Sequence, residues 1–380
     1  MSIVWPFVPQ RNLKEIMEWK TEVIRCRSAE QRLCLRNVPR TTIEYDFQLL
    51  PQEIEAATVL ARQYGADEFL LPFWHELEYV GTVASSATNI TVDTTTKRFK
   101  AGGTGFIIGA DGKYETFTID TVNPGSIDVA APGIVLGFAG AVVMPAHPAR
   151  VKKPFNFRKY AAEYFTAEME YILTEDFELT ASIPYPAFNS SYVLTDRPLV
   201  GNARESHTRE FEGFGNLAGP LFYSESYTYP VGTSAMAWSF NTVAEIWAFR
   251  LWMYNVKGKQ ESFYAPRWTR DFIMNTDALS TDDFLIFDRN DILEDTYTGA
   301  ICIVKNDGTQ LYYLIDSWEA HTASTYRMNL TTTLGVDVAA ADVELVCRMP
   351  MMRFNSDNIE FDYQDGKVVD VRLPIMEVPE

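Results

Sequence analysis

The chain has 380 residues, 47% of them hydrophobic and 22% charged, a composition typical of a folded globular protein of two or three domains. Its 33 Lys and Arg against 51 Asp and Glu give a formal net charge of −18, which argues against a protein that grips nucleic acid through a basic patch. The same charge suits a surface past which nucleic acid moves without binding, because like charges repel.

The opening residues 1–15 lack a basic stretch followed by a long apolar one, so we expect no secretory signal. No apolar run approaches the roughly 18 residues that a membrane span needs. The four cysteines have no metal-binding spacing and are expected to be free thiols in a reducing compartment. We therefore expect a soluble protein, made in the cytoplasm and without membrane insertion. The cysteines are Cys26, Cys34, Cys302 and Cys347.

The first part of the chain predicts strands around one helix. Residues 22–47 alternate apolar and polar side chains, the period of two that is typical of strands. Residues 51–64 have apolar side chains at helical spacing, with Pro51 in the first turn and Gly65 just past the end. A strand over residues 69–74 is expected to leave this helix.

Two more β segments and a linker follow. Residues 80–143 are rich in Val, Ile, Thr and Gly, with turn signals that are typical of a small all-β unit. Residues 163–174 alternate and predict another strand. Residues 182–201 are rich in Pro, Ser and Asn and are predicted to form a linker.

The same plan then recurs. Thr242 and Glu245 form a predicted capping box that opens a helix running to Val256. A second β-rich stretch covers 284–347, and 367–377 predicts a late strand. We expect a mainly β (α+β) fold with two tandem copies of a β-sandwich, each with one flanking helix and an inserted small β subdomain. The expected boundaries are 1–181 with its insertion at about 80–143, a linker at 182–205, and 206–380 with its insertion at about 273–347.

Short motifs support this duplication, because they recur in the same order. Phe263 lies 194 positions after Phe69, the Asp307-Gly308 pair 196 positions after Asp111-Gly112, and Met349-Pro350 205 positions after Met144-Pro145. Asp120 and Asp316 also match, which indicates a role in the fold rather than in catalysis. The repeated anchors are Phe69, Pro72, Trp74, Phe263, Pro266 and Trp268.

The anchors have architectural explanations. The Phe and Trp rings are large enough to pack each strand onto the helix before it. A proline between them removes a hydrogen-bond donor, which suits an edge strand or the start of a strand. Glycine in each Asp-Gly pair suits a hairpin turn that requires a positive φ.

Several residues are candidates for contacts between subunits. The helix over 243–256 is apolar nearly all round, so it must be covered on both sides by another layer or another subunit. Its Trp247 and Trp252 are candidate assembly contacts. Arg32 and Arg36 are either strand-edge charges or ion pairs at a subunit contact. The aromatic loop 210–230 is either a contact loop or a packed linker.

No pattern points to catalysis, a cofactor or a metal, so we expect no catalytic, cofactor-binding or metal-binding residues. The four histidines have no metal-ligand spacing, and no G-x-S-x-G elbow is present. The glycines at 102–105 lack a phosphate-loop pattern, and the acidic run 288–295 lacks the glycine of a calcium loop. Nothing singles out a pair of carboxylates for glycoside cleavage.

The amino-terminal series resembles the opening of tail proteins from long-tailed bacteriophages. It consists of Trp19-x-Thr21-Glu22-Val23-Ile24, Glu30-Gln31-Arg32, Leu35-Arg36 and Pro39-Arg40. In those proteins a helix ends near a Gly-Lys or Gly-Arg pair, and an aromatic-Pro segment follows. Gly258-Lys259 and residues 263–271 match that form best.

This resemblance implies a structural virion protein of the tail tip or baseplate, assembled in the host cytoplasm. Family members build rings from a tail-tube-like β-sandwich, and distal tail proteins form homohexamers. Hub proteins with two such domains form homotrimers that mimic six-fold symmetry, so a homotrimer is the expectation here. The expected partners are the tail tube and other baseplate or tail-tip proteins, and DNA passes through the ring without specific binding. The alternatives are a receptor- or carbohydrate-binding tail protein and a cell-wall hydrolase.

Overall fold

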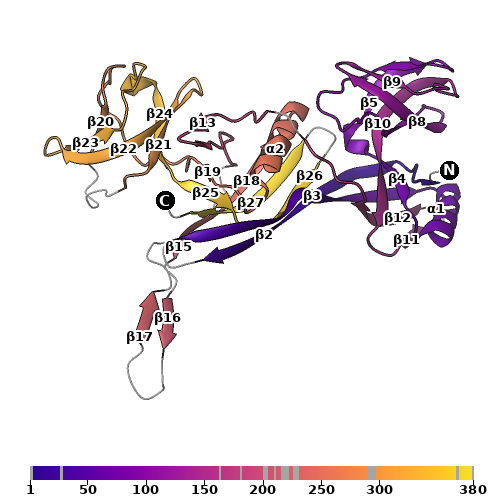
Figure 1. Cartoon of the computed structure of the whole chain (residues 1–380), viewed down its shortest axis with the longest axis horizontal. Coiled ribbons are helices and arrows are strands. Elements are labelled where there is room, and N and C mark those ends of the chain that lie inside the picture. The colour runs from indigo at the N-terminus through magenta and orange to yellow at the C-terminus, as the bar shows by residue number, and fades with distance from the viewer. Residues whose placement is uncertain are drawn as a thin grey trace.

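The computed structural model describes residues 3–25, 29–161, 164–179, 182–199, 204–208, 211–214, 222–225, 231–289, 297–364 and 368–378. With 53% strand and 10% helix, the protein is mainly β, which confirms the predicted fold class. Figure 1 shows one long sheet along the molecule, with helix α2 over its middle and two small β bodies above its ends.

Among the described residues, eight strands, each antiparallel to its neighbours, form the continuous row along the long sheet, and they come from both ends of the sequence. From one edge to the other they are β15 (Arg204–Thr208), β18 (Val231–Phe240), β27 (Val369–Glu377), β26 (Asn358–Tyr363), β2 (Pro9–Arg25), β3 (Glu30–Leu49), β12 (Tyr164–Leu173) and β11 (Asn156–Ala161). The pairing of β26 with β2 therefore joins the two halves of the chain in one sheet.

Both predicted helices are present. Helix α1 covers Pro51–Tyr64 and α2 covers Val243–Val256. The capping box of α2 is confirmed, since Thr242 Oγ1 accepts from the Glu245 amide at 3.2 Å and the Glu245 carboxylate accepts from the Thr242 amide at 3.1 Å. Gly65 ends α1 with a φ of −60°, so backbone freedom is not what requires glycine there. A Cβ would instead meet the Ala61 carbonyl oxygen at 2.5 Å.

Further strands and one turn connect each half to its small β body. In the first half these are β1 (Ile3–Val4), β4 (Phe69–Pro72), the 3-10 turn η1 (Trp74–Glu76) and β10 (Phe138–Val151); in the second they are β19 (Phe263–Tyr264) and β25 (Met351–Phe354). The predicted strand over 69–74 thus ends at Pro72. Pro72 is the last residue of a strand that pairs on both sides, rather than the start of one or part of an edge strand.

The two small β bodies have the same order of pairing. The first comprises β5 (Glu78–Val83), β6 (Asn89–Thr91), β7 (Thr104–Ile108), β8 (Tyr114–Asn123) and β9 (Ser126–Val129); the second comprises β20 (Phe284–Asp288), β21 (Ala300–Lys305), β22 (Gln310–Ala320), β23 (Thr325–Leu330), the turn η2 (Ala340–Asp342) and β24 (Val343–Met349). In the first body the strands pair in the order β7, β8, β9, β6, and in the second they pair in the matching order β21, β22, β23, β20. Asp120 and Asp316 both lie at a β-bulge, where the register shifts by one residue.

The register gives a residue-by-residue correspondence between the halves. Phe69 pairs with Ala149, and Phe263 pairs with Met352, so Ala149 corresponds to Met352. These two residues are 203 positions apart, whereas the two Met-Pro pairs are 205 positions apart. The Met-Pro match is therefore wrong by two residues, because strand pairing rather than the dipeptide determines which positions correspond.

The segment predicted as a linker packs against α2. It contains the small hairpin of β13 (Ala187–Phe188) and β14 (Ser191–Tyr192). The ring of Tyr185 lies 4.7 Å from that of Trp252, and Tyr192 lies 6.1 Å from the same ring on another side. One side of α2 therefore faces the sheet and the other faces this segment, which explains why the helix is apolar nearly all round.

A further hairpin pairs β16 (Phe211–Phe214) with β17 (Phe222–Glu225). None of the helices in the described ranges is long and apolar enough to cross a membrane.

Candidate assembly interface

The junction between the halves is a six-residue antiparallel pairing of β2 with β26, from Leu13 opposite Tyr363 to Glu18 opposite Asn358. On the face of the sheet turned away from the helices, Lys14 Nζ lies 2.6 Å from the Glu360 carboxylate. Both side chains are about half exposed, so this pair contributes less than about 1 kcal/mol. The stronger contacts lie on the helix side.

A cluster of buried charges ties the junction together from the helix side. Glu15 of β2 is fully buried and accepts from Arg98 Nη1 at 2.6 Å and from Arg250 of α2. Arg98 Nε donates to Glu76 at 2.6 Å, and the Tyr363 hydroxyl lies 3.3 Å from Glu15. Two carboxylates, of Glu15 and Glu76, thus balance two guanidinium groups. One of these, Arg250, belongs to the second half, and the other, Arg98, belongs to the first insertion.

The charge balance decides the ionisation of the cluster. Burial opposes the ionised form of Glu15, but the guanidinium groups of Arg250 and Arg98 outweigh it and hold the pKa of Glu15 well below its ordinary value. The same groups lower the pKa of Glu76 against the effect of burial. Both carboxylates therefore stay charged, and the two halves are held by complete ion pairs rather than by neutral groups.

His75 lies beside the same cluster and is neutral there. Its Nε2 accepts from Arg98 Nη2 at 2.7 Å, and its ring lies 5.2 Å from that of Phe73 and 5.0 Å from that of Tyr363. Burial lowers the pKa of His75 to about 4, although Glu15 and Glu76 at 3.8 and 3.7 Å favour the protonated form. Arg98 and Arg250 add to the lowering.

This gives a pH prediction. The unfolded chain protonates its histidine near pH 6.5 and the folded chain only near pH 4, so acid favours the unfolded state between these values. We expect stability that is complete above pH 6.5 and falls by about 3 kcal/mol down to pH 4. Denaturant unfolding of the His75→Gln variant across this range should show a smaller loss than the parent chain, and exposed His321→Gln should not. An unchanged slope in His75→Gln would contradict this assignment.

The long sheet has two open edges. In the described part of the chain, β11 pairs along its length only with β12, and β15 pairs only with β18. An open edge presents unpaired amide and carbonyl groups to a further strand. Because β11 corresponds to β26 and β15 corresponds to β2, the two open edges are equivalents of the two strands that meet at the internal junction.

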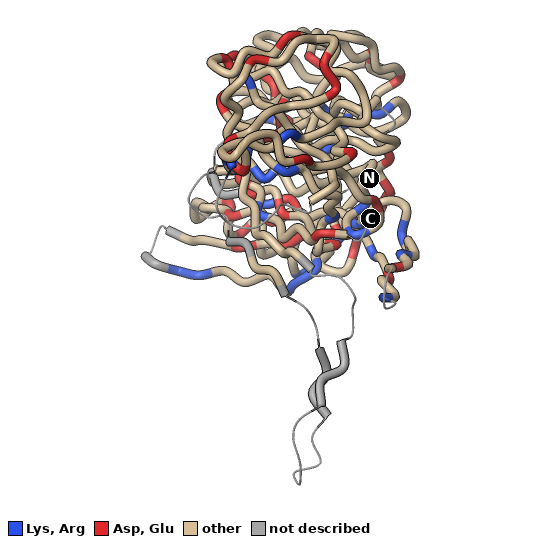
Figure 2. Tube along the Cα trace, turned by 90° about the vertical axis from the view of Figure 1, so that its left-hand side faces the viewer, with Lys and Arg blue, Asp and Glu red and all other residues tan. Residues whose placement is uncertain are grey.

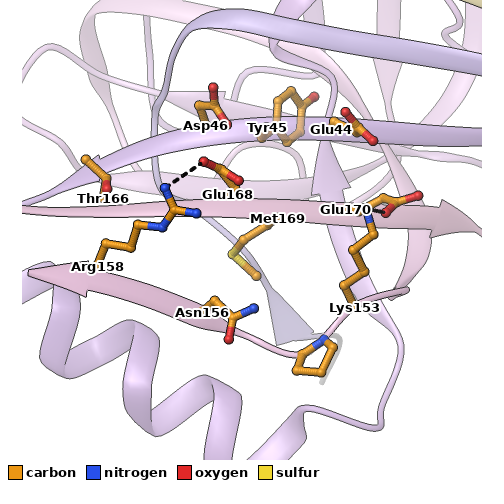
Figure 3. Close-up of a pocket in the computed structure, with 11 residues that line it drawn as sticks. Glu44, Tyr45, Asp46, Lys153, Asn156, Arg158, Thr166, Glu168, Met169 and Glu170 are labelled. Atoms are coloured by element: carbon orange, nitrogen blue, oxygen red, sulfur yellow. Dashed lines mark ion pairs between the residues drawn. The ribbon is translucent and has the colours of Figure 1, made fainter.

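The face of the sheet opposite the helices carries opposed carboxylates together with the cations that pair with some of them. Three pairs of carboxylates lie directly opposite each other on neighbouring strands: Glu44 with Glu170, Asp46 with Glu168, and Asp362 with Asp370. Figure 3 shows the first two pairs in a pocket of about 280 Å³, where Arg158 and Lys153 are the cations. Figure 2 shows acidic positions spread over the body of the molecule.

Opposed carboxylates destabilise a sheet. Burial, followed by the charge of Glu170, raises the pKa of Glu44, and burial, followed by the charge of Glu168, raises that of Asp46. Lys152 and Lys153 offset part of this cost by contacting Glu170. Ionised Glu44 and Asp46 therefore cost stability, whereas Lys152 and Lys153 lower the pKa of Glu170 against the effect of burial.

The repeat anchors occupy corresponding strands but differ in environment. Phe69 and Phe263 are both fully buried, and the ring of Phe263 packs on that of Trp252 at 5.3 Å. Trp74 is buried in the main core beside Phe106. Pro266 is buried just after β19. Trp268 is half-buried with a φ of 59°, and it lies under the guanidinium group of Arg197 rather than in the main core.

The candidate contact residues are partly engaged within the chain. Arg32 donates to Ser262 at 3.3 Å, and Arg36 donates to the Glu18 carbonyl at 3.0 Å. Trp252 is fully buried, which leaves Trp247, half-buried beside the Arg250 guanidinium group, as the one of these two tryptophans that a partner can reach. Most of loop 210–230 and of the acidic run 288–295 lies outside the described residues.

The β2–β3 hairpin lies along the second half, which the sequence did not predict. Arg353 is buried and donates from Nε to Glu30 at 2.6 Å, and the Thr21 amide donates to Asp357 at 2.8 Å. The opposite side of this hairpin exposes Ile24, Leu33 and Leu35. Through its bonds to Arg353 and Asp357, the β2–β3 hairpin contributes a second, separate contact between the halves.

Within the described ranges, no group of three or more His, Cys, Asp or Glu side chains is arranged to hold a metal ion. Cys34, Cys302 and Cys347 are free thiols, as expected. Comparison with protein-family models and with curated proteins finds no match for this chain.

Proposed function

We propose that this protein is a structural, non-enzymatic component of a bacteriophage tail tip or baseplate. Copies of the chain would form a ring, as a distal tail or hub protein, that joins the tail tube to the tip and receptor-binding proteins around the DNA channel. We further propose that its two halves are tandem copies of one tail-tube-like unit. The resemblance of the segments around Trp19 and Gly258 and the matching strand pairings of the halves support this proposal.

The observation that carries the proposal is the internal junction. There β2 and β26 continue one sheet across two corresponding units, and β15 and β11 are the matching strands at the two open edges. The same contact can therefore be repeated between copies, and a repeated head-to-tail contact that closes on itself gives a ring. Three copies would supply six corresponding units, so we propose a homotrimer with pseudo-six-fold symmetry, with a homohexamer as the alternative.

The opposed carboxylates support the proposed orientation. Both helices pack on the other side of the sheet, so the side bearing the opposed carboxylates is the one suited to line a channel. A lining of this charge repels the phosphates of DNA and lets it pass without specific binding.

The test is the assembly state of the purified chain. Light scattering should give a mass of three copies, and electron microscopy should show a ring with a central channel. Antibodies against the chain should label one end of the tail in purified virions. A protein that stays monomeric at all concentrations, even with tail-tube protein added, and that is absent from virions would contradict the proposal.

A further inference from the structure

The register at the internal junction can be transferred to the two open edges. Phe157 pairs with Ala167, and Phe361 pairs with Val371, at corresponding places on β12 and β27. Glu15 pairs with Ile43 of β3, and Glu205 pairs with Ser234 of β18, again at corresponding places. Phe157 therefore has the register position of Phe361, and Glu205 has that of Glu15.

We infer that β11 of one copy pairs antiparallel with β15 of the next copy in the register of the internal junction. Since Phe361 lies opposite Glu15 there, Phe157 will lie opposite Glu205 of the next copy. Asn156 will lie opposite Ser206, as Glu360 lies opposite Ile16. This inference rests on the proposed ring and adds to it the two strands and the register by which copies join.

The chemistry of the corresponding positions agrees with this register. At the internal junction, Glu15 receives hydrogen bonds from Arg250 and Tyr363 of the second half. The counterpart of Tyr363 on the open edge is Lys159, because Tyr363 and Lys159 pair with corresponding residues of β27 and β12. Lys159 is exposed, with its ammonium group 5.7 Å from the Phe165 ring. It is therefore available as the cation for a carboxylate at position 205.

The outer side of the same contact is less favourable. Lys14 lies opposite Asp362 at the internal junction, and the counterparts of this pair are Arg204 and Arg158. Two arginines opposite each other repel. Glu168 lies 3.6 Å from Arg158 and offsets part of this repulsion. In this register the positions of Lys159 and Glu205 bring opposite charges together, whereas those of Arg158 and Arg204 bring like charges together.

Cysteine cross-linking of the full chain tests the register. A chain with Asn156→Cys and Ser206→Cys should form disulfide-linked trimers on mild oxidation, seen by denaturing electrophoresis without reductant. The matched control combines Asn156→Cys with Thr208→Cys, which lies two residues beyond the expected partner. There the expected Cα separation of about 7–8 Å is too long for a disulfide. The parent chain and the single variants control for the native cysteines.

Charge exchange tests the ion pair. Lys159→Glu and Glu205→Lys should each weaken trimer formation about tenfold or more in sedimentation experiments, and the double exchange should restore most of it. Trimers that cross-link equally well in the control pair, or no rescue by the double exchange, would overturn the register and leave the proposed ring intact. A chain that is monomeric in every variant and in the parent would overturn both.

Discussion

Replacing Glu15 by glutamine is expected to lower the free energy of unfolding by about 3–5 kcal/mol, because the guanidinium groups of Arg98 and Arg250 would stay buried without their shared counter-charge. The substitution preserves the size of the side chain, so the loss reports charge rather than packing. Urea unfolding of the purified chain, followed by tryptophan fluorescence, measures it.

Glu18→Gln is the matched control for Glu15→Gln. It lies on the same strand, its side chain is 39% exposed, and its partners Arg36 and Arg40 are 3.6 and 3.9 Å away. Glu18→Gln should lower the free energy of unfolding by less than about 1 kcal/mol, as for other exposed pairs. Equal effects of the two substitutions would show that the buried cluster does not hold the halves together.

Replacing Trp252 by alanine should cost about 3–5 kcal/mol, the range for deleting a large aromatic side chain from a core. Trp252 is fully buried and packs on Tyr185, Tyr192 and Phe263, so its removal leaves a cavity between α2, β19 and the segment that covers the helix. Thermal unfolding followed by circular dichroism measures the loss.

Trp247→Ala is the control on the same helix. Trp247 is half-buried, and its ring lies 5.3 Å from the Arg250 guanidinium carbon. Removing it should cost about 1 kcal/mol in stability. If Trp247 is an assembly contact, its removal will weaken trimers far more than it destabilises the fold. A Trp252→Ala variant as stable as Trp247→Ala would contradict the packing described for α2.

The local elements were predictable from the sequence because their signals are local. The helix over 51–64 follows from apolar spacing between a proline and a glycine, and the helix that begins at Val243 follows from its capping box. The matching of Asp120 with Asp316 was also visible, and the structure gives its cause in two corresponding bulges. The spacing of motifs could not reveal that positions around the Met-Pro pairs correspond at 203 rather than 205 positions, because the chain between the motifs differs in length in the two halves.

The junction could not be predicted, since its parts are far apart in the sequence. Glu15 and Tyr363 are separated by 348 positions, and Arg98 and Glu76 come from the first insertion and its connection. One signal was present. Arg250 is the only charged residue in the helix after Glu245, and a lone arginine in an apolar helix requires a buried counter-charge.

The difference between the two kinds of contact has a mechanical consequence for the proposed ring. Within a copy, the buried pairs of Glu15 and the unbroken chain make the joint permanent. Between copies, the register places Arg158 opposite a second arginine and only one ion pair, of Lys159 with Glu205, is expected, so that joint is the weaker one. A force on such a ring would break the three contacts between copies before the three internal junctions. It would therefore separate whole copies and leave the two halves of each copy together.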